Sequence, residues 1–147
     1  MATNLQFAIT LTPVGYANKW PEFYLKIDNE LQDLGVLVAE RTYNFDVELE
    51  DGSHTINVGF TNKVNTDTVA NNNEILADKA IIVERVVVEG YEFKDFLYRA
   101  VYTPVGRPQS HSNYLSWNGE WQLEFTTPIF TWLHKTQHLG WIYEKNL

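Results

Sequence analysis

The chain has 147 residues, no cysteine and a formal net charge of -8 at pH 7, with 44% hydrophobic and 14% aromatic residues. This composition indicates one globular domain and excludes disulfides, thiolate zinc sites and cysteine nucleophiles. The negative charge argues against a nucleic-acid partner. No apolar run approaches the roughly 20 residues of a membrane helix, and the N-terminus lacks a signal-peptide pattern. We therefore expect synthesis in the cytoplasm and no membrane insertion.

The first part of the chain alternates apolar and polar residues with the period of β-strands. This alternation predicts strands over residues 5–11 and 23–27, and a short apolar strand over 34–38. Residues 43–49 and 54–60 alternate in the same way on either side of Asp51-Gly52. Because an Asp-Gly pair between alternating segments is typical of a tight turn, we expect these two strands to form a central hairpin.

Polar segments interrupt the middle of the chain. Residues 62–78 carry no helical or strand period, so we predict a long functional or flexible loop there. Residues 81–89 are almost continuously apolar and β-branched, which predicts a buried strand. The Pro-, Gly- and Ser-rich segment 102–114 predicts a second long loop.

The last third combines a strand with a helix. Trp121, Leu123 and Phe125 predict a final strand. Thr127 and Pro128 are suited to the N-cap and first position of a helix over residues 128–139. We therefore predict an all-β, antiparallel, jelly-roll-like β-sandwich with one C-terminal α-helix, as a single domain over residues 1–147.

Oxygen-bearing side chains gather around the polar insert. The candidate metal ligands are Asn62, Asp67, Asp78 and Glu84. Calcium takes six to eight oxygen ligands, often from a loop that wraps the ion. The spacing differs from that of an EF-hand, and solvated acidic loop residues are the alternative interpretation.

The segments around the insert also carry a family resemblance. They read GSHTI and VGFTN before the insert, and DKAIIVE and VVVEG after it. This series resembles the calcium-dependent, xylan-binding type of carbohydrate-binding module over about residues 24–90. The matching positions are Phe60, Thr61, Asn62, Asp78 and Glu84. The resemblance implies a β-sandwich, glycan recognition and calcium, whereas Lys63 places a positive charge where the family has an aspartate.

Aromatic residues in or beside the predicted loops are candidates for stacking on sugar rings. They are Tyr16, Trp20, Tyr114 and Trp117. The alternative is that these rings anchor the long loops to the core.

The C-terminal segment is too apolar to lie in solvent, which suggests a protein interface. Its candidate interface residues are Trp132, Leu133, Leu139, Trp141, Ile142 and Tyr143. In size and style the chain also looks like small β-sandwich structural proteins of tailed phages. We find neither an HExxH pattern nor a serine elbow, and expect no enzyme. The first hypothesis is therefore a structural component of an assembly of protein subunits, namely a virion. Glycan recognition, with or without calcium, is the alternative.

Overall fold

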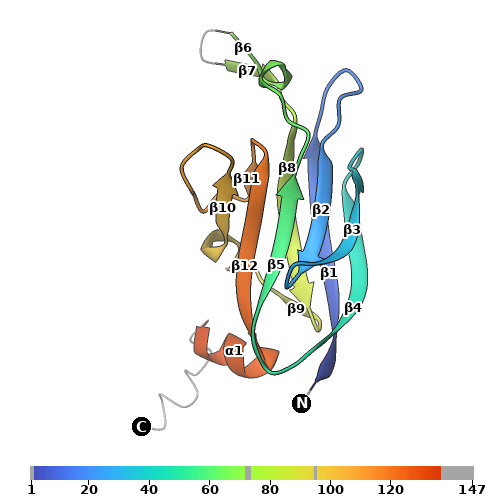
Figure 1. The fold of residues 1–147 in the computed structure, drawn as a ribbon, viewed down its shortest axis with the longest axis vertical. Helices are drawn as coiled ribbons and strands as arrows, with labels where there is room; N and C mark the ends of the chain where they lie inside the picture. The colour runs from blue at the N-terminus through green and yellow to red at the C-terminus, as the bar shows by residue number, and fades with distance from the viewer. Residues whose placement is uncertain (1, 72–73, 95, 137–147) are drawn as a thin grey trace.

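The computed structural model describes residues 2–71, 74–94 and 96–136, and these residues form two five-stranded antiparallel sheets packed face to face (Figure 1). Sheet 1 contains β1 (Thr3–Val14), β4 (Arg41–Leu49), β8 (Ala80–Val88), β9 (Tyr91–Glu92) and β11 (Tyr114–Leu115). Sheet 2 contains β2 (Glu22–Ile27), β3 (Glu30–Val36), β5 (Gly52–Phe60), β10 (Val101–Pro104) and β12 (Gly119–Thr127). Outside them lie β6 (Val69–Asn71), β7 (Glu74–Ala77), two 3-10 turns, η1 (Asn65–Asp67) and η2 (Leu97–Arg99), and α1 (Ile129–Thr136).

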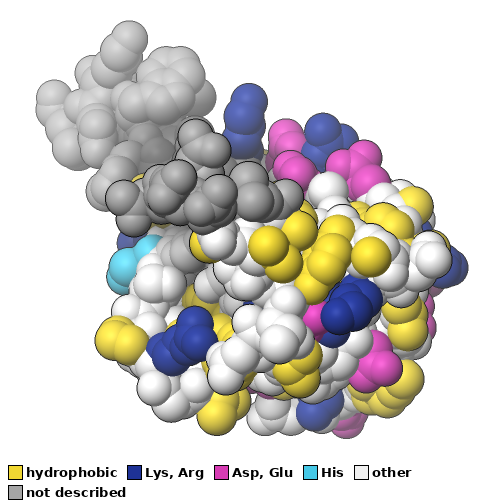
Figure 2. Space-filling view, turned by 90° about the horizontal axis from the view of Figure 1, so that it is seen from above, with side chains coloured by type: hydrophobic (Ala, Val, Ile, Leu, Met, Phe, Trp, Pro, Cys, Tyr) yellow, Lys and Arg dark blue, Asp and Glu magenta, His cyan; other side chains and the backbone are white. Residues whose placement is uncertain are grey.

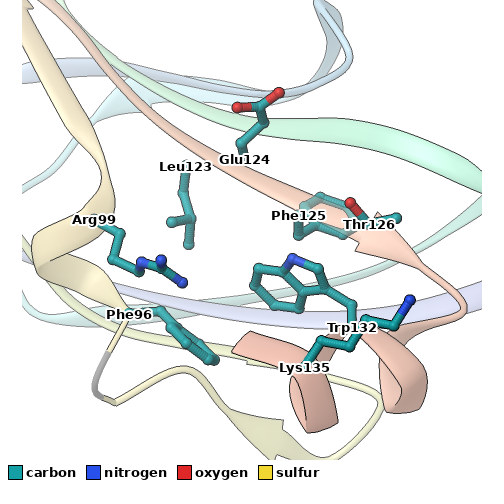
Figure 3. Close-up of a pocket in the computed structure, with 8 residues that line it drawn as sticks. All are labelled: Phe96, Arg99, Leu123, Glu124, Phe125, Thr126, Trp132 and Lys135. Carbon is teal, nitrogen blue, oxygen red and sulfur yellow. The ribbon is translucent and has the colours of Figure 1, made fainter. Parts of the chain in front are cut away.

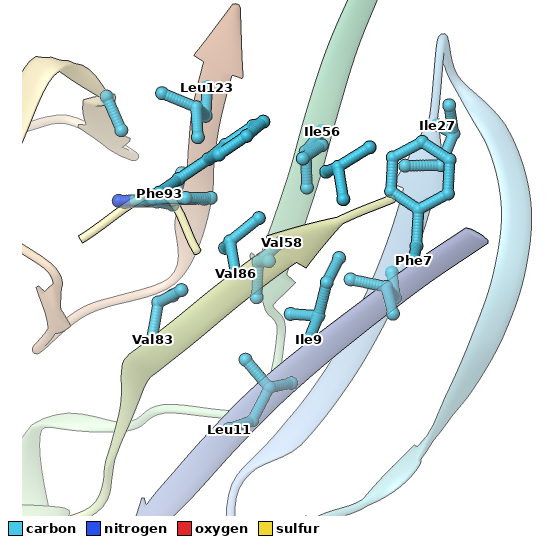
Figure 4. Packing of buried hydrophobic residues seen from close by; sticks show 14 of the residues in the cluster. Phe7, Ile9, Leu11, Ile27, Ile56, Val58, Val83, Val86, Phe93 and Leu123 are labelled. Carbon is cyan, nitrogen blue, oxygen red and sulfur yellow. The ribbon is translucent and has the colours of Figure 1, made fainter. Parts of the chain in front are cut away.

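Alternating apolar residues of both sheets fill the space between them (Figure 4). Ile9 and Leu11 from β1 lie fully buried, as do Ile56 and Val58 from β5. Each such side chain contributes about 1.5–3 kcal/mol through removal from water. The predicted β-sandwich with a C-terminal helix is therefore confirmed. The buried strand predicted at residues 81–89 is confirmed as β8, which pairs with β1 and β11.

The predicted central hairpin is wrong. β4 pairs with β1 in sheet 1, whereas β5 lies between β2 and β12 in sheet 2. The Asp51-Gly52 segment therefore carries the chain from one sheet to the other. Thr127 fixes this corner, because its Oγ1 donates to the Glu50 carbonyl at 2.9 Å and accepts from the Gly52 N–H at 3.1 Å.

Other elements also differ from those predicted, and the strand predicted over 34–38 is β3, which spans Glu30–Val36. The insert is structured, since η1 and the β6–β7 hairpin occupy much of it. The helix begins at Ile129, because Thr127 is still paired with Gly52 as the last residue of β12. The described helices include none long and apolar enough to cross a membrane.

Candidate functional site

The insert lies at one end of the sandwich, which we call the loop end. The β1–β2 loop and the β6–β7 hairpin lie there, and α1 lies at the opposite end (Figure 1). Seen from above, the described loop-end surface mixes hydrophobic side chains with acidic and basic ones (Figure 2). Distant segments meet there, because Tyr16 Oη donates to the Thr66 carbonyl at 2.8 Å. The Asn118 side chain also accepts from the Lys63 N–H at 2.7 Å and donates to its carbonyl at 2.8 Å.

A buried ion pair forms the centre of this end. Lys63 Nζ donates to Asp78 Oδ1 and, at 2.5 Å, to the carbonyl of Lys79. The Lys63 and Asp78 side chains are only 2% and 6% exposed. Asp78 also accepts hydrogen bonds from Thr68 Oγ1 at 2.7 Å and from Tyr114 Oη at 2.6 Å. The carboxylate therefore has partners on both oxygens.

A second ion pair adjoins the first. Lys79 Nζ lies 2.9 Å from Asp67 Oδ2 and donates to the Asn62 carbonyl at 2.6 Å. Asp67 Oδ2 also accepts from the Val64 N–H at 2.8 Å, closing the turn of η1. Lys63, Asp67, Asp78 and Lys79 together form what we call the lysine–aspartate cluster. All four residues are buried.

The formal charges in this cluster balance, with two ammonium and two carboxylate groups. Burial alone would raise the pKa of Asp78, but hydrogen bonds from Lys63, Tyr114 and Thr68 outweigh it and hold that pKa below 3.8. At Asp67, burial again raises the pKa, but the hydrogen bond and charge of Lys79 outweigh it, so the pKa of Asp67 is also lowered. Both aspartates are therefore ionised at neutral pH, and loss of either lysine would leave a buried negative charge without its partner.

The calcium ligands predicted from the sequence occupy different surroundings. Asn62, Asp67 and Asp78 contribute atoms in or beside the cluster, whereas Glu84 is exposed on β8. Within the described part of the chain, no three His, Cys, Asp or Glu residues are grouped to hold a metal ion. The residues present do not fit calcium, since both carboxylates already bind ammonium groups that would repel a divalent cation. In the sequence, the positive charge of Lys63 already indicated that calcium would not fit. That Lys79 pairs with Asp67 in the same way was not predicted.

The loop aromatics predicted to contact glycans all lie at the loop end, where the structure gives each a contact within the chain. Tyr114 and Tyr16 use their hydroxyls to hold the cluster and the insert. The Trp20 ring covers Gly15, where an added Cβ would lie only 2.4 Å from a ring carbon. The Trp117 ring carries the Arg107 guanidinium 4.2 Å from its centroid. These contacts agree with the loop-anchoring alternative and leave sugar stacking untested.

An open groove of about 640 Å³ lies on the outer face of sheet 2, towards the loop end. Two aromatic residues, one aliphatic residue, several polar residues and a glycine line it. The lining residues are Tyr24, Phe60, Thr61, Thr103, Val105, Asn118, Gly119, Glu120 and Gln122. Sequence reasoning missed this groove, although Tyr24 lies on the polar face of a correctly predicted strand.

The Tyr24 ring is held rigidly in this groove. It lies against Gly59, where an added Cβ would be 1.9–2.4 Å from three ring atoms. Its hydroxyl donates to Glu120 Oε2 at 2.5 Å, while Asn57 Nδ2 donates to Glu120 Oε1 at 2.6 Å. Burial, followed by the hydrogen bond to Glu120, raises the pKa of Tyr24 above its ordinary value of 10.0. Lys26 Nζ lies over the ring, 4.7 Å from its centroid, as a cation–π contact and a hydrogen-bond donor.

A second cavity, of about 580 Å³, lies beside α1 (Figure 3). Trp132 points into it and packs on Phe96 and Phe93, with ring centroids 5.0 and 5.3 Å apart. Leu133 is 3% exposed and belongs to the core. These two residues of the predicted protein interface therefore pack within their own chain. Leu139, Trp141, Ile142 and Tyr143 lie outside the described residues.

No family model matches the chain, and no curated protein matches it. Two solved structures are similar to it in fold. A vCBM60 in complex with galactobiose is 18% identical, with a TM-score of 0.54 over 80% of this chain and 96% of that chain. The selenomethionine form of vCBM60 is 16% identical, with a TM-score of 0.52 over 82% of this chain and 90% of that chain. The latter was described in work on an evolutionary link, by circular permutation, between two families of calcium-dependent carbohydrate-binding modules. The β-sandwich is therefore similar in fold to these two carbohydrate-binding modules.

Proposed function

We propose that this protein is a glycan-binding module that carries out no catalysis. The observation that carries the proposal is the likeness in fold to almost the whole of a module solved with galactobiose. The resemblance of residues 24–90 to a xylan-binding type of module supports the same class of ligand. The alternative hypothesis from the sequence therefore replaces the virion hypothesis as the preferred function.

The groove on sheet 2 is the surface that we assign to the glycan. A sugar ring offers apolar C–H faces edged by hydroxyl groups, so a binding site needs an apolar platform ringed by donors and acceptors. Tyr24 supplies such a platform once the flexible Lys26 side chain, whose Nζ lies over the ring, moves aside and donates to a sugar hydroxyl. Gln122 and Thr103 add further polar groups along the lining. The groove is open, so it suits a chain that enters from the side rather than a small molecule that must be enclosed.

A glycan array followed by calorimetry tests this proposal. The full chain is first screened on an array of plant and microbial polysaccharides, and then titrated with galactobiose, xylo-oligosaccharides and the array hits. We expect a glycan to bind, and Tyr24→Ala to weaken binding by at least about tenfold, equivalent to about 1.4 kcal/mol. Tyr98, 65% exposed on η2, provides the control, because Tyr98→Ala should leave binding unchanged.

A Trp117→Ala variant separates the groove from the loop aromatics. If Tyr24→Ala keeps full affinity while Trp117→Ala loses it, the glycan binds at the loop end and our assignment of the groove is wrong. Silence of the folded protein on the array would contradict the proposed function itself.

The assembly function predicted from the sequence stays a prediction. One surface suits it: Leu31, Leu34 and Val36 on the edge strand β3 are 51%, 60% and 54% exposed. An apolar row on an open sheet edge is a common place for another chain to dock. Light scattering of the purified chain tests this second function, with Leu34→Lys expected to break any oligomer and a strictly monomeric protein counting against it.

A further inference from the structure

The sequence resemblance implies a calcium ion beside Asn62 and Asp78, and the lysine–aspartate cluster lies at that place. Lys63 directly follows Asn62 in the segment after β5, at the position where the resembling family has an aspartate. Lys79 follows Asp78 at the start of β8. We infer that the ammonium groups of Lys63 and Lys79 replace a calcium ion in this protein and order its loop end without metal.

The surroundings of each ammonium group carry this inference. Lys63 Nζ contacts a carboxylate oxygen of Asp78 and the carbonyl oxygen of Lys79. Lys79 Nζ contacts a carboxylate oxygen of Asp67 and the carbonyl oxygen of Asn62. Carboxylate and backbone carbonyl oxygens are the groups that calcium recruits in proteins. A compact ammonium group with three donors can bind the same oxygens without a metal.

The cluster also ties together the segments that a bound ion would have to hold. Through Asp67 it fixes η1, and through Asp78 it fixes the start of β8. Tyr114 attaches β11 to the same carboxylate, and Asn118 clamps the backbone of Lys63 from the other side. These ties are part of the chain itself, so neither dilution nor a chelator can remove them, unlike a bound ion whose stabilising effect depends on its free concentration.

The first experiment uses the unmodified full chain and calcium chloride alone. We expect no heat beyond dilution in a calorimetric titration, and the same thermal unfolding temperature in excess EDTA and in millimolar calcium. Stoichiometric calcium binding, or a lower unfolding temperature in EDTA, would overturn the inference. Because no glycan is present, the result is independent of the proposed function.

The second experiment restores an acidic side chain at the lysine position. Lys63→Asp changes the formal charge of the cluster from zero to minus two, so calcium should raise the unfolding temperature of this variant. Lys94→Asp is the matched control, since it makes the same charge change on an exposed side chain just after β9, outside the cluster, and should not respond to calcium. A folded Lys63→Asp variant that ignores calcium would overturn the inference. If Lys63→Asp does not fold, Lys63→Asn is used instead, because it removes the positive charge without adding a negative one.

Discussion

Two polar networks of this sandwich each contain a carboxylate, but the two carboxylates differ in burial and in the charge of their partners. Asp78 at the loop end is 6% exposed and binds the ammonium group of Lys63. Glu120 on sheet 2 is only partly buried, and its described partners are the neutral groups of Tyr24 and Asn57. The first network, which we call the closed network, buries its charged groups. The second, the open network, lines an open groove.

This difference separates a structural role from a recognition role. A buried carboxylate whose oxygens are already bound has little left to offer a ligand, and its removal affects folding first. A ring fixed at the rim of an open groove loses little freedom when a ligand stacks on it, so it can contribute to affinity. Variants that change only one of the two networks test this separation.

Removing one charge of the closed network should have the largest effect. We expect Lys63→Met to destabilise the protein by about 3–5 kcal/mol, because Asp78 is left buried without its counter-charge. Urea unfolding measures this change. Lys19→Met is the control and should cost less than about 1 kcal/mol, since the exposed Lys19 lies 4.0 Å from Asp67.

A double variant tests whether the loss comes from charge. Lys63→Met combined with Asp78→Asn removes both charges of the pair, and should recover part of the stability that Lys63→Met loses. Equal losses in the single and double variants would show that packing, not the unpaired carboxylate, sets the cost.

A change at Gly59 should affect the open network alone. Any Cβ at this position would collide with the Tyr24 ring, so Gly59→Ala must displace the ring from its place against β5. We expect glycan affinity to fall by at least about tenfold, or about 1.4 kcal/mol, as with Tyr24→Ala. Calorimetry measures affinity, and unchanged affinity with a correctly folded variant would contradict the role of the ring.

Acid should weaken the closed network. Asp67 and Asp78 have pKa values below 3.8 in the folded protein, while in the unfolded chain they titrate near that value. The unfolded state therefore binds more protons as the pH falls below about 3.8, and the stability from these groups is lost as the pH passes through the folded pKa values. Urea midpoints measured down this range should fall more steeply for the unmodified chain than for the Lys63→Met, Asp78→Asn double variant.

Alkali should have the smallest effect, on one tyrosine of each network. Burial, then the hydrogen bonds to Glu120 and Asp78, raise the pKa values of Tyr24 and Tyr114 above 10.0. Their contribution to stability is present below that pH and is lost as the pH rises towards the folded values. Near-ultraviolet difference spectra should show Tyr24 and Tyr114 ionising only on unfolding. Tyr24→Phe and Tyr114→Phe identify the two signals.

The sequence predicts the strands better than their partners. Alternation shows that Val47 and Val58 face a core, but a hairpin and a corner between sheets produce the same pattern. For that reason β4 and β5 were predicted as neighbours although they lie in different sheets. Similarly, the cluster at Asp67 and Asp78 was visible as an acidic insert, whereas the part played by Lys79 depends on where its side chain points.

The groove could not be predicted from local pattern at all. Tyr24, Gly59 and Glu120 are adjacent only because β5 lies between β2 and β12. A glycine inside a strand ordinarily weakens it, because it has no side chain to pack. In the folded sheet Gly59 is the gap that lets the Tyr24 ring lie flat.

The most direct test of the account is one glycan array probed with the full chain, first in excess EDTA and then in millimolar calcium. We predict binding to at least one glycan, with equal strength in both conditions, because the lysines supply the positive charge at the loop end. Binding that appears only in calcium would contradict this account.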